Sequence, residues 1–161
     1  FFIYNKNGDT RMDYKVTVRN EEEMMEIAQN IESEKFPNMV ICLDGELGSG
    51  KTVFVKGFAQ ALGITEVITS PTFNIIKEYY SGELPLFHMD VYRVKSGCQK
   101  FGFNDYYNKE GVSIIEWSEL IAKYLPEERL DIEFKIIDEN TRILKFKPHG
   151  KIYEDLCNSV L

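Results

Sequence analysis

Residues 45–52 have the sequence Gly-Glu-Leu-Gly-Ser-Gly-Lys-Thr, a glycine-rich stretch whose context is the first clue to the fold. The apolar residues 39–43 and the acid Asp44 precede it. A helix-like segment that ends at Gly63 follows it. A strand, a glycine loop and a helix in this order are the context in which a backbone loop can cradle phosphates. The sequence therefore predicts a phosphate-binding loop, or P-loop, at residues 45–52.

Each residue type in the predicted P-loop has a physical role in holding a chain of phosphates. Glycines let the backbone turn tightly with its amide groups pointing inward, and the following helix adds the positive end of its dipole. Lys51 can reach the β- and γ-phosphates, and the Thr52 hydroxyl can ligate Mg²⁺. The alternative, a glycine-rich turn with a stray lysine, is disfavoured by the flanking strand and helix. The expected contacts to a nucleotide are Gly45, Leu47, Gly48, Ser49, Gly50, Lys51, Thr52 and Val53.

Two acids end apolar runs downstream of the P-loop. Asp90 ends residues 85–90, Pro-Leu-Phe-His-Met-Asp, and Glu116 ends residues 112–116, Val-Ser-Ile-Ile-Glu. A nucleotide-bound Mg²⁺ needs carboxylates that hold the metal and place a nucleophile. Either acid alone is as easily a surface residue at a strand end, but two of them after a P-loop favour a shared site. Thr52, Asp90 and Glu116 are therefore the predicted metal ligands.

Three residues near these motifs have both a functional and a structural interpretation. Thr72 lies in a proline-set loop that can bring a hydroxyl to the γ-phosphate or its water, although spacing alone favours a plain loop threonine. Trp117 follows Glu116 directly, and a lone tryptophan is more often a half-buried packing residue than a ligand contact. His88 lies two residues before Asp90 and can orient that site, but a hydrogen-bonded structural histidine is the more frequent finding.

Length, charge and cysteine content narrow the class of protein. A chain of 161 residues with 43% hydrophobic and 28% charged residues is predicted to form a globular domain. Its net charge of -7 argues against a broad nucleic-acid-binding surface. Neither a zinc site nor a disulfide framework is expected, because the three cysteines include no Cys-x-x-Cys pair; Cys42 is a predicted core residue. Cations near the C-terminus are interpreted as a solvated strand face: Arg142, Lys145, Lys147, His149 and Lys151.

The location and the extent of the domain follow from simple sequence features. A reducing cytoplasm fits the cysteine content, no apolar run approaches the roughly 18 residues of a membrane helix, and no signal peptide is recognised. Residues 1–13 are left outside the domain as a segment that is appended, truncated or disordered, and residues 14–161 are predicted to form one domain. Strands are expected at residues 14–18, 39–43, 73–80, 112–116, 130–137 and 141–147, and a further strand ends near residue 90. Helices are expected at about 21–33, 51–62 and 118–124.

Four motifs, GELGSGKT, TSPTF, FHMDVYR and IEWSE, follow one another in this chain. In this order and spacing they resemble the bacterial threonylcarbamoyladenosine-biosynthesis ATPase family, TsaE (also called YjeE), over residues 14–147. The resemblance implies an α/β fold: a single-domain P-loop NTPase-like fold with a mixed central sheet and flanking helices. It also implies an Mg²⁺-dependent ATPase, weak alone, that supports the modification of adenosine 37 of tRNA with the TsaD–TsaB protein pair. Contact with tRNA is expected to be indirect.

The resemblance also implies roles for individual residues. Thr52 and Glu116 would hold Mg²⁺, Asp90 would support the metal and the hydrolytic water, and Thr72 would belong to a switch loop. The expected catalytic residues are Lys51, Thr72, Asp90 and Glu116, and further contacts to ATP or ADP are expected from Trp117, Glu21 and Arg142. Two departures from the family pattern are Val53, where a second threonine is common, and residues 95–111, which lack an acidic, leucine-rich helix.

Two other functions remain open from the sequence. A small-molecule kinase shares the P-loop but normally needs a lid with several arginines, and the five arginines here do not cluster. A nucleotide-sensing module without catalysis is disfavoured by the paired acids. The products formed from ATP separate the three functions.

Overall fold

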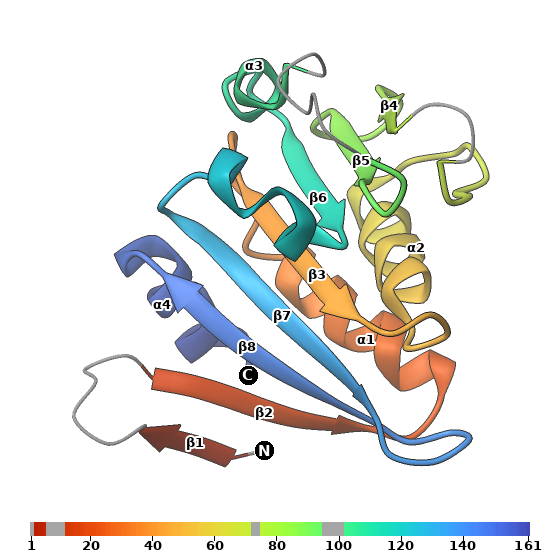
Figure 1. Ribbon diagram of the computed structural model, residues 1–161, viewed down its shortest axis with the longest axis vertical. Coiled ribbons are helices and arrows are strands. Elements are labelled where there is room, and N and C mark those ends of the chain that lie inside the picture. Colours follow the sequence, from red (N-terminus) through yellow and green to blue (C-terminus); the bar gives the residue numbers. More distant parts are fainter. Residues whose placement is uncertain (1, 6–11, 72–74, 95–101) are drawn as a thin grey trace.

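One mixed β-sheet forms the centre of the fold. The computed structural model describes residues 2–5, 12–71, 75–94 and 102–161, and for residues 2–5 and 12 the backbone alone. Within these residues, eight strands are hydrogen-bonded side by side in the order β1-β2-β8-β7-β3-β6-β5-β4 (Figure 1). They are β1 (Phe2–Asn5), β2 (Met12–Val18), β3 (Val40–Gly45), β4 (Ile76–Tyr79), β5 (Leu86–Asp90), β6 (Val112–Glu116), β7 (Arg129–Ile136) and β8 (Arg142–His149).

The strands around the P-loop are parallel. β3 pairs in parallel with β6 and β7, and β5 pairs in parallel with β6, whereas both outer parts of the sheet are antiparallel. The register places Asp90 beside Glu116 and Glu116 beside Leu43, so the carboxyl ends of β3, β5 and β6 meet at one edge. Open α/β sheets bind their ligands outside this edge. The mixed sheet with flanking helices confirms the predicted fold class.

Helices cover both faces of the sheet (Figure 1). The helices α1 (Glu21–Glu32), α2 (Lys51–Leu62) and α4 (Lys151–Val160) pack on one face and bury the larger apolar cluster. The short helix α3 (Phe103–Tyr107) and the 3-10 helix η2 (Ser118–Tyr124) contribute to a smaller cluster on the other face. Asn20 caps α1: its side-chain oxygen accepts a hydrogen bond from the Glu23 N–H at 2.8 Å.

Helices α1 and α2 approach each other closely at Gly57. A β-carbon at this position would lie 2.7 Å from the Met25 Cα and 3.1 Å from the Ala28 Cβ. Glycine therefore stands here because two helix backbones meet with no room for a side chain. The close contact fixes α2 against α1, and with it the start of α2, where the P-loop ends.

Helix α4 was not predicted from the sequence, and it is anchored to the centre of the sheet. Its buried side chains Tyr153, Leu156 and Cys157 have the i, i+3, i+4 spacing of an amphipathic helix. The Val40 N–H at the start of β3 donates a hydrogen bond of 2.9 Å to the Tyr153 hydroxyl oxygen. The Tyr153 ring also packs edge-on against Phe36, with ring centroids 5.3 Å apart.

Other elements differ from the prediction in extent or type. The sheet includes residues 2–5 and 12–13, which precede the predicted domain start at residue 14. Helix α3 lies in a segment for which no element was predicted, because five residues are too few to show a helical period. Residues 118–124 form a 3-10 helix with a kink at Ile121. Cys42 is a buried free thiol, as predicted, and the helices of the described residues include none that could cross a membrane.

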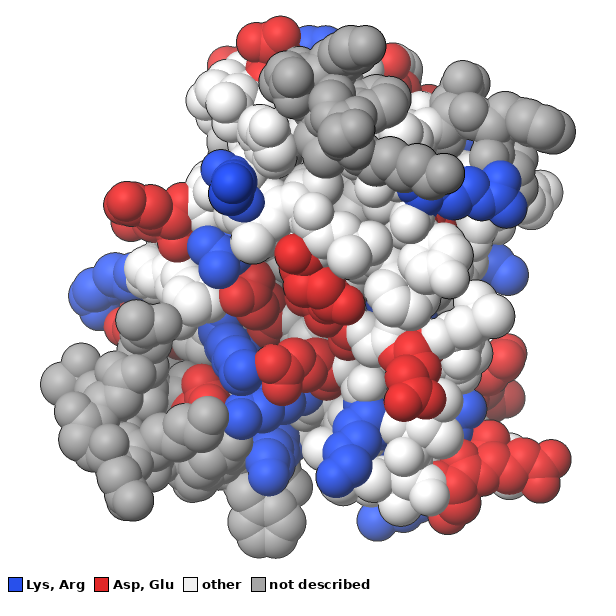
Figure 2. All heavy atoms as spheres, viewed as in Figure 1, with Lys and Arg blue, Asp and Glu red and all other residues white. Residues whose placement is uncertain are grey.

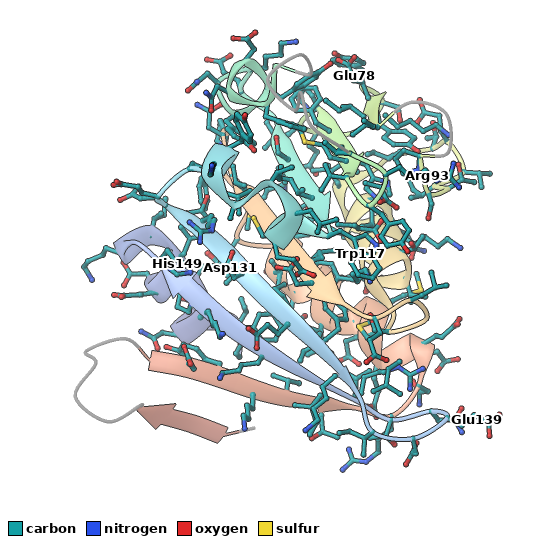
Figure 3. All side chains as sticks on the ribbon, viewed as in Figure 1. Glu78, Arg93, Trp117, Asp131, Glu139 and His149 are labelled. Carbon is teal, nitrogen blue, oxygen red and sulfur yellow. The ribbon has the colours of Figure 1, made fainter. Side chains whose placement is uncertain are left out.

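The cations near the C-terminus lie beside acids rather than in a basic patch. Lys145 pairs with Asp13 on the neighbouring strand, and His149 Nε2 lies 2.7 Å from Asp131 Oδ2 (Figure 3). Figure 2 shows blue and red side chains mixed over the open face of β2, β7 and β8. This supports the interpretation of a polar strand face. Arg142, by contrast, reaches the P-loop.

Candidate nucleotide-binding site

A cavity of about 610 Å³ opens at the edge where the parallel strands end. The P-loop, the start of α2, the start of α1 and the β7–β8 hairpin all contribute to its wall. Its size suits a nucleotide, since ligand pockets range from about 300 to 1,000 Å³. The described residues that line it are Val18, Asn20, Glu21, Met24, Leu47, Gly48, Ser49, Gly50, Lys51, Thr52, Val53, Ser70, Asp90, Glu116, Trp117, Glu139, Asn140 and Arg142.

The P-loop backbone adopts a conformation that glycine permits and other residues rarely adopt. Gly50 has φ 105° and precedes the first residue of α2, which begins at Lys51. Among the described residues no side chain caps this helix start, so the first backbone N–H groups of α2 remain available to a ligand. N–H groups at a helix N-terminus attract anions, and this one lies on the wall of the cavity.

Lys51 is held close to the loop by hydrogen bonds to backbone carbonyl oxygens. Only 5% exposed, it donates from Nζ to the carbonyl oxygens of Gly45 and, at 3.1 Å, of Glu46. The same ammonium group lies 4.0 Å from the centre of the Trp117 ring. Burial lowers the pKa of Lys51, and the nearby Glu116 carboxylate opposes that shift. A bound phosphate would offer this ammonium group a charged acceptor in place of neutral carbonyls.

A cluster of oxygen atoms lies beside Lys51 at the start of α2. Thr52 Oγ1 is 3.3 Å from Glu116 Oε1 and 3.1 Å from Ser70 Oγ. Glu116 is only 3% exposed. Asp90 is its register partner on β5, and Asp90 Oδ1 accepts a hydrogen bond of 3.0 Å from the Tyr92 N–H. Burial raises the pKa of Asp90, and the charge of Glu116 adds to the rise.

This donor set fits Mg²⁺ better than a transition metal. The atoms that meet here are hydroxyl and carboxylate oxygens, and among the described residues no group of three or more histidine, cysteine or acidic side chains could hold a metal. Mg²⁺ is usually bound through one or two carboxylates together with phosphate oxygens, not by a cage of protein ligands. Thr52, Glu116 and Asp90 can therefore hold Mg²⁺ that arrives with a nucleotide.

Aromatic rings lie beside Lys51 at the wall of the cavity. Trp117 has φ 62°, a left-handed conformation that is unusual for a bulky residue. Its ring lies over Lys51 and packs against Tyr92, with the Trp117 and Tyr92 ring centroids 4.8 Å apart. A strained backbone conformation of this kind persists only where the surroundings hold it, and it is frequent at functional sites.

The wall of the cavity combines apolar and polar side chains. Glu21 and Arg142 both line it, as does Glu139 at the tip of the β7–β8 hairpin (Figure 3). Arg142 donates at 3.1 Å to the Gly48 carbonyl oxygen of the P-loop and at 2.7 Å to the Asp138 carbonyl oxygen of its own hairpin. Arg142 thus ties the hairpin to the tip of the P-loop.

The structure brings nearly all predicted site residues together. Every one that lies in the described residues lines the cavity except Gly45, whose carbonyl oxygen instead accepts a hydrogen bond from Lys51. Thr72 lies outside the described residues. Sequence reasoning missed the contact of Ser70 with Thr52, although Ser70 directly precedes the predicted switch segment. It also missed Val18, Met24, Glu139 and Asn140, for which no motif gave a signal.

Comparisons with known proteins agree with this geometry. A family model described as threonylcarbamoyl adenosine biosynthesis protein TsaE matches residues 18–144. The tRNA threonylcarbamoyladenosine biosynthesis protein TsaE of Bacillus subtilis is 45% identical over 141 residues, which cover 88% of this chain and 89% of that protein. The protein of the same name from Treponema pallidum is 45% identical over 105 residues, or 64% of this chain and 77% of its own.

A solved structure gives the same result for the fold. The crystal structure of Bacillus subtilis YdiB matches with a TM-score of 0.84 and 40% sequence identity, covering 95% of this chain and 97% of that one. Family, sequence and fold thus agree over nearly the whole length. The chain belongs to the TsaE family, the threonylcarbamoyl adenosine biosynthesis proteins.

Proposed function

We propose that this chain is an Mg²⁺-dependent ATPase, which hydrolyses ATP to ADP and phosphate in support of tRNA threonylcarbamoyladenosine biosynthesis. The observation that carries the proposal is the Thr52 hydroxyl, 3.3 Å from the buried Glu116 carboxylate at the start of the helix that follows the P-loop. A P-loop hydroxyl and a strand-end carboxylate are the pair that holds nucleotide-bound Mg²⁺ in this class of fold.

The side chains of the site divide the work between them. The P-loop amide groups and Lys51 bind the phosphates, and Thr52 and Glu116 hold Mg²⁺. Mg²⁺, when bound, neutralises charge that develops on the phosphate oxygens. Asp90 supports the metal and orients the hydrolytic water. Its raised pKa makes the Asp90 carboxylate a better proton acceptor than an exposed aspartate.

The remaining contacts concern the base and the switch loop. Glu21 and Arg142, which both line the cavity, are the proposed neighbours of the adenine ring. Trp117 is the proposed cover of the phosphate end, because its ring already lies over the Lys51 ammonium group. Thr72 remains the proposed switch-loop residue on the grounds of family resemblance.

Turnover by the chain alone is expected to be slow. Arg142 is the one arginine among the described residues that line the cavity, and its guanidinium donates to main-chain carbonyl oxygens. The site thus contains no arginine placed to neutralise transition-state charge within the described residues, and such an arginine contributes 10³–10⁵-fold in related enzymes. We propose that the TsaD–TsaB pair completes or aligns the site. The net charge of -7 supports indirect contact with tRNA.

Product analysis tests the activity against its two alternatives. The chain is incubated with Mg·ATP, with and without the TsaD–TsaB pair, and nucleotide, free phosphate and phosphorylated acceptors are quantified. ADP with an equal amount of free phosphate supports the ATPase. ADP with a phosphorylated acceptor and no free phosphate would make the chain a kinase. Bound but unchanged ATP under both conditions would make it a nucleotide-sensing module.

A further inference from the structure

The most deeply buried ionisable side chain next to the site is a histidine to which the proposed function gives no role. His88 lies on β5 and is 0% exposed. Its Nε2 lies 2.6 Å from Glu116 Oε2 on the parallel neighbour β6. A hydrogen bond this short to a carboxylate is a strong one. The sequence suggested a structural histidine here, and the structure shows that its partner is the proposed metal ligand.

The position of the ring proton follows from what surrounds the other nitrogen. His88 Nδ1 is buried and has no hydrogen-bond partner among the described residues. A buried N–H without an acceptor is rarer in proteins than a buried acceptor without a donor. The hydrogen therefore sits on Nε2, which donates to Glu116 Oε2.

This hydrogen bond restricts how the Glu116 carboxylate can turn. The carboxyl group of glutamate rotates about its last torsion in a broad energy well, so packing alone fixes it poorly. With Oε2 bound to His88, rotation would break the 2.6 Å hydrogen bond. The Thr52 hydroxyl lies 3.3 Å from the other oxygen, Oε1, and 3.5 Å from Oε2, and within the described residues it is the hydrogen-bond partner of Oε1. His88 thus holds Oε2 from the protein core, while Oε1, the oxygen nearer to the Thr52 hydroxyl, makes no contact with His88.

We propose that His88 is a positioning residue for metal binding: it holds the Glu116 carboxylate so that Oε1 and Thr52 Oγ1 together receive Mg²⁺. This inference rests on the proposed Mg²⁺-dependent function. Outer partners of this kind commonly change metal affinity by 10–100-fold when they are replaced. A histidine that merely filled space would change the stability of the fold and leave the metal dependence of nucleotide binding as it was.

Replacing His88 by glutamine or by asparagine distinguishes a positioning residue from one that only fills space. In His88→Gln the side-chain amide nitrogen can occupy the place of Nε2 and still donate to Glu116. In His88→Asn the amide nitrogen lies near the place of Nδ1 and falls short of Glu116. Both variants bury an amide in place of an imidazole, so their costs to folding are similar. Tyr153→Phe, which removes a buried hydrogen bond far from the cavity, serves as a control for lost stability alone.

The measurement is the dissociation constant of ATP by titration calorimetry, in EDTA and in excess Mg²⁺, at a temperature where each variant is folded. The dissociation constant in EDTA divided by that in Mg²⁺ reports how strongly the metal favours nucleotide binding, independently of turnover. We expect His88→Asn to reduce this ratio by 10–100-fold and to leave the constant in EDTA within about twofold. We expect His88→Gln and Tyr153→Phe to stay close to the parent ratio.

Each other outcome overturns an identifiable claim. Equal ratios for His88→Asn and His88→Gln, both close to that of the parent, would make His88 a structural residue. Equal losses in both variants would show that reach to Glu116 does not matter, which also overturns the positioning role. A parent chain whose ATP binding does not depend on Mg²⁺ would refute the proposed function itself, and the inference with it.

Discussion

Replacing Tyr153 by phenylalanine removes one oxygen atom from the junction between α4 and the first residue of β3. The Val40 N–H donates to this oxygen at 2.9 Å, and both residues are only 2% exposed. The phenylalanine ring can keep the edge-on contact with Phe36, in which the ring centroids are 5.3 Å apart. The change therefore leaves a buried backbone N–H without an acceptor and alters little else.

The expected loss follows from the cost of that unpaired group. Removing one partner of a buried hydrogen bond costs about 1–3 kcal/mol. For a chain of 150–250 residues, 1 kcal/mol corresponds to roughly 2–4 °C in the melting temperature. We therefore expect Tyr153→Phe to lower the free energy of unfolding by about 1–3 kcal/mol and the melting temperature by roughly 2–12 °C.

The assay is urea unfolding followed by circular dichroism, together with a thermal scan of the same samples. Tyr80→Phe is the matched control, because the Tyr80 hydroxyl donates to Glu78 on the surface and the residue is 64% exposed. That control should stay within about 0.5 kcal/mol of the parent. Equal stability of Tyr153→Phe and the parent would refute the reasoning, because the Val40 N–H would then have another acceptor.

Three further predictions concern packing, charge and the metal site. Gly57→Ala should lower the free energy of unfolding by about 1–2 kcal/mol, because its β-carbon would lie 2.7 Å from the Met25 Cα; a rise would show that the helices can separate at no cost. The hydrogen bond to Asp44 raises the pKa of Glu119 from its usual 4.5 to about 7, so the protonated carboxyl stabilises the fold at low pH and this contribution is lost as the pH rises through that interval. Glutamine cannot ionise, so between pH 4.5 and pH 7 the free energy of unfolding of Glu119→Gln should rise by about 1 kcal/mol relative to that of the parent, as measured by urea unfolding. This value is smaller than the full shift would give, because solvent screens a partly exposed carboxyl. If the difference in free energy between variant and parent did not change with pH, the raised pKa of Glu119 would be contradicted. Thr52→Val should lose most Mg²⁺-dependent phosphate release while Thr52→Ser keeps it, and equal activity of the two would remove the hydroxyl from the metal site.

The part of the site that depends on short motifs could be predicted from the sequence. The P-loop residues and the two strand-end acids lie in local patterns whose chemistry is strict, so Lys51, Thr52, Asp90 and Glu116 could be named before the structure. The structure then places Asp90 beside Glu116 in the parallel pairing of β5 with β6. The 2.6 Å contact of His88 with Glu116 joins two neighbouring strands and is a tertiary contact. No local sequence pattern indicates it.

The parts that could not be predicted depend on distant contacts. Helix α4 has a clear apolar spacing at Tyr153, Leu156 and Cys157, but its ten residues are too few to form a stable helix alone. Its stability comes from packing on the sheet and from the Val40 hydrogen bond. The position of Arg142 in the cavity also depends on a distant contact, because Arg142 reaches Gly48 only once the β7–β8 hairpin has folded beside the P-loop.

The central claim is that Thr52 and Glu116 form the metal site of an ATPase that its partners activate. The most direct test is phosphate release from Mg·ATP by the chain alone and with the purified TsaD–TsaB pair, with Glu116→Ala measured in parallel. We expect slow phosphate release by the chain alone, strong stimulation by the pair, and loss of both in the variant. Release that is the same with and without the pair would contradict the partner dependence, and full activity of Glu116→Ala would contradict the metal site.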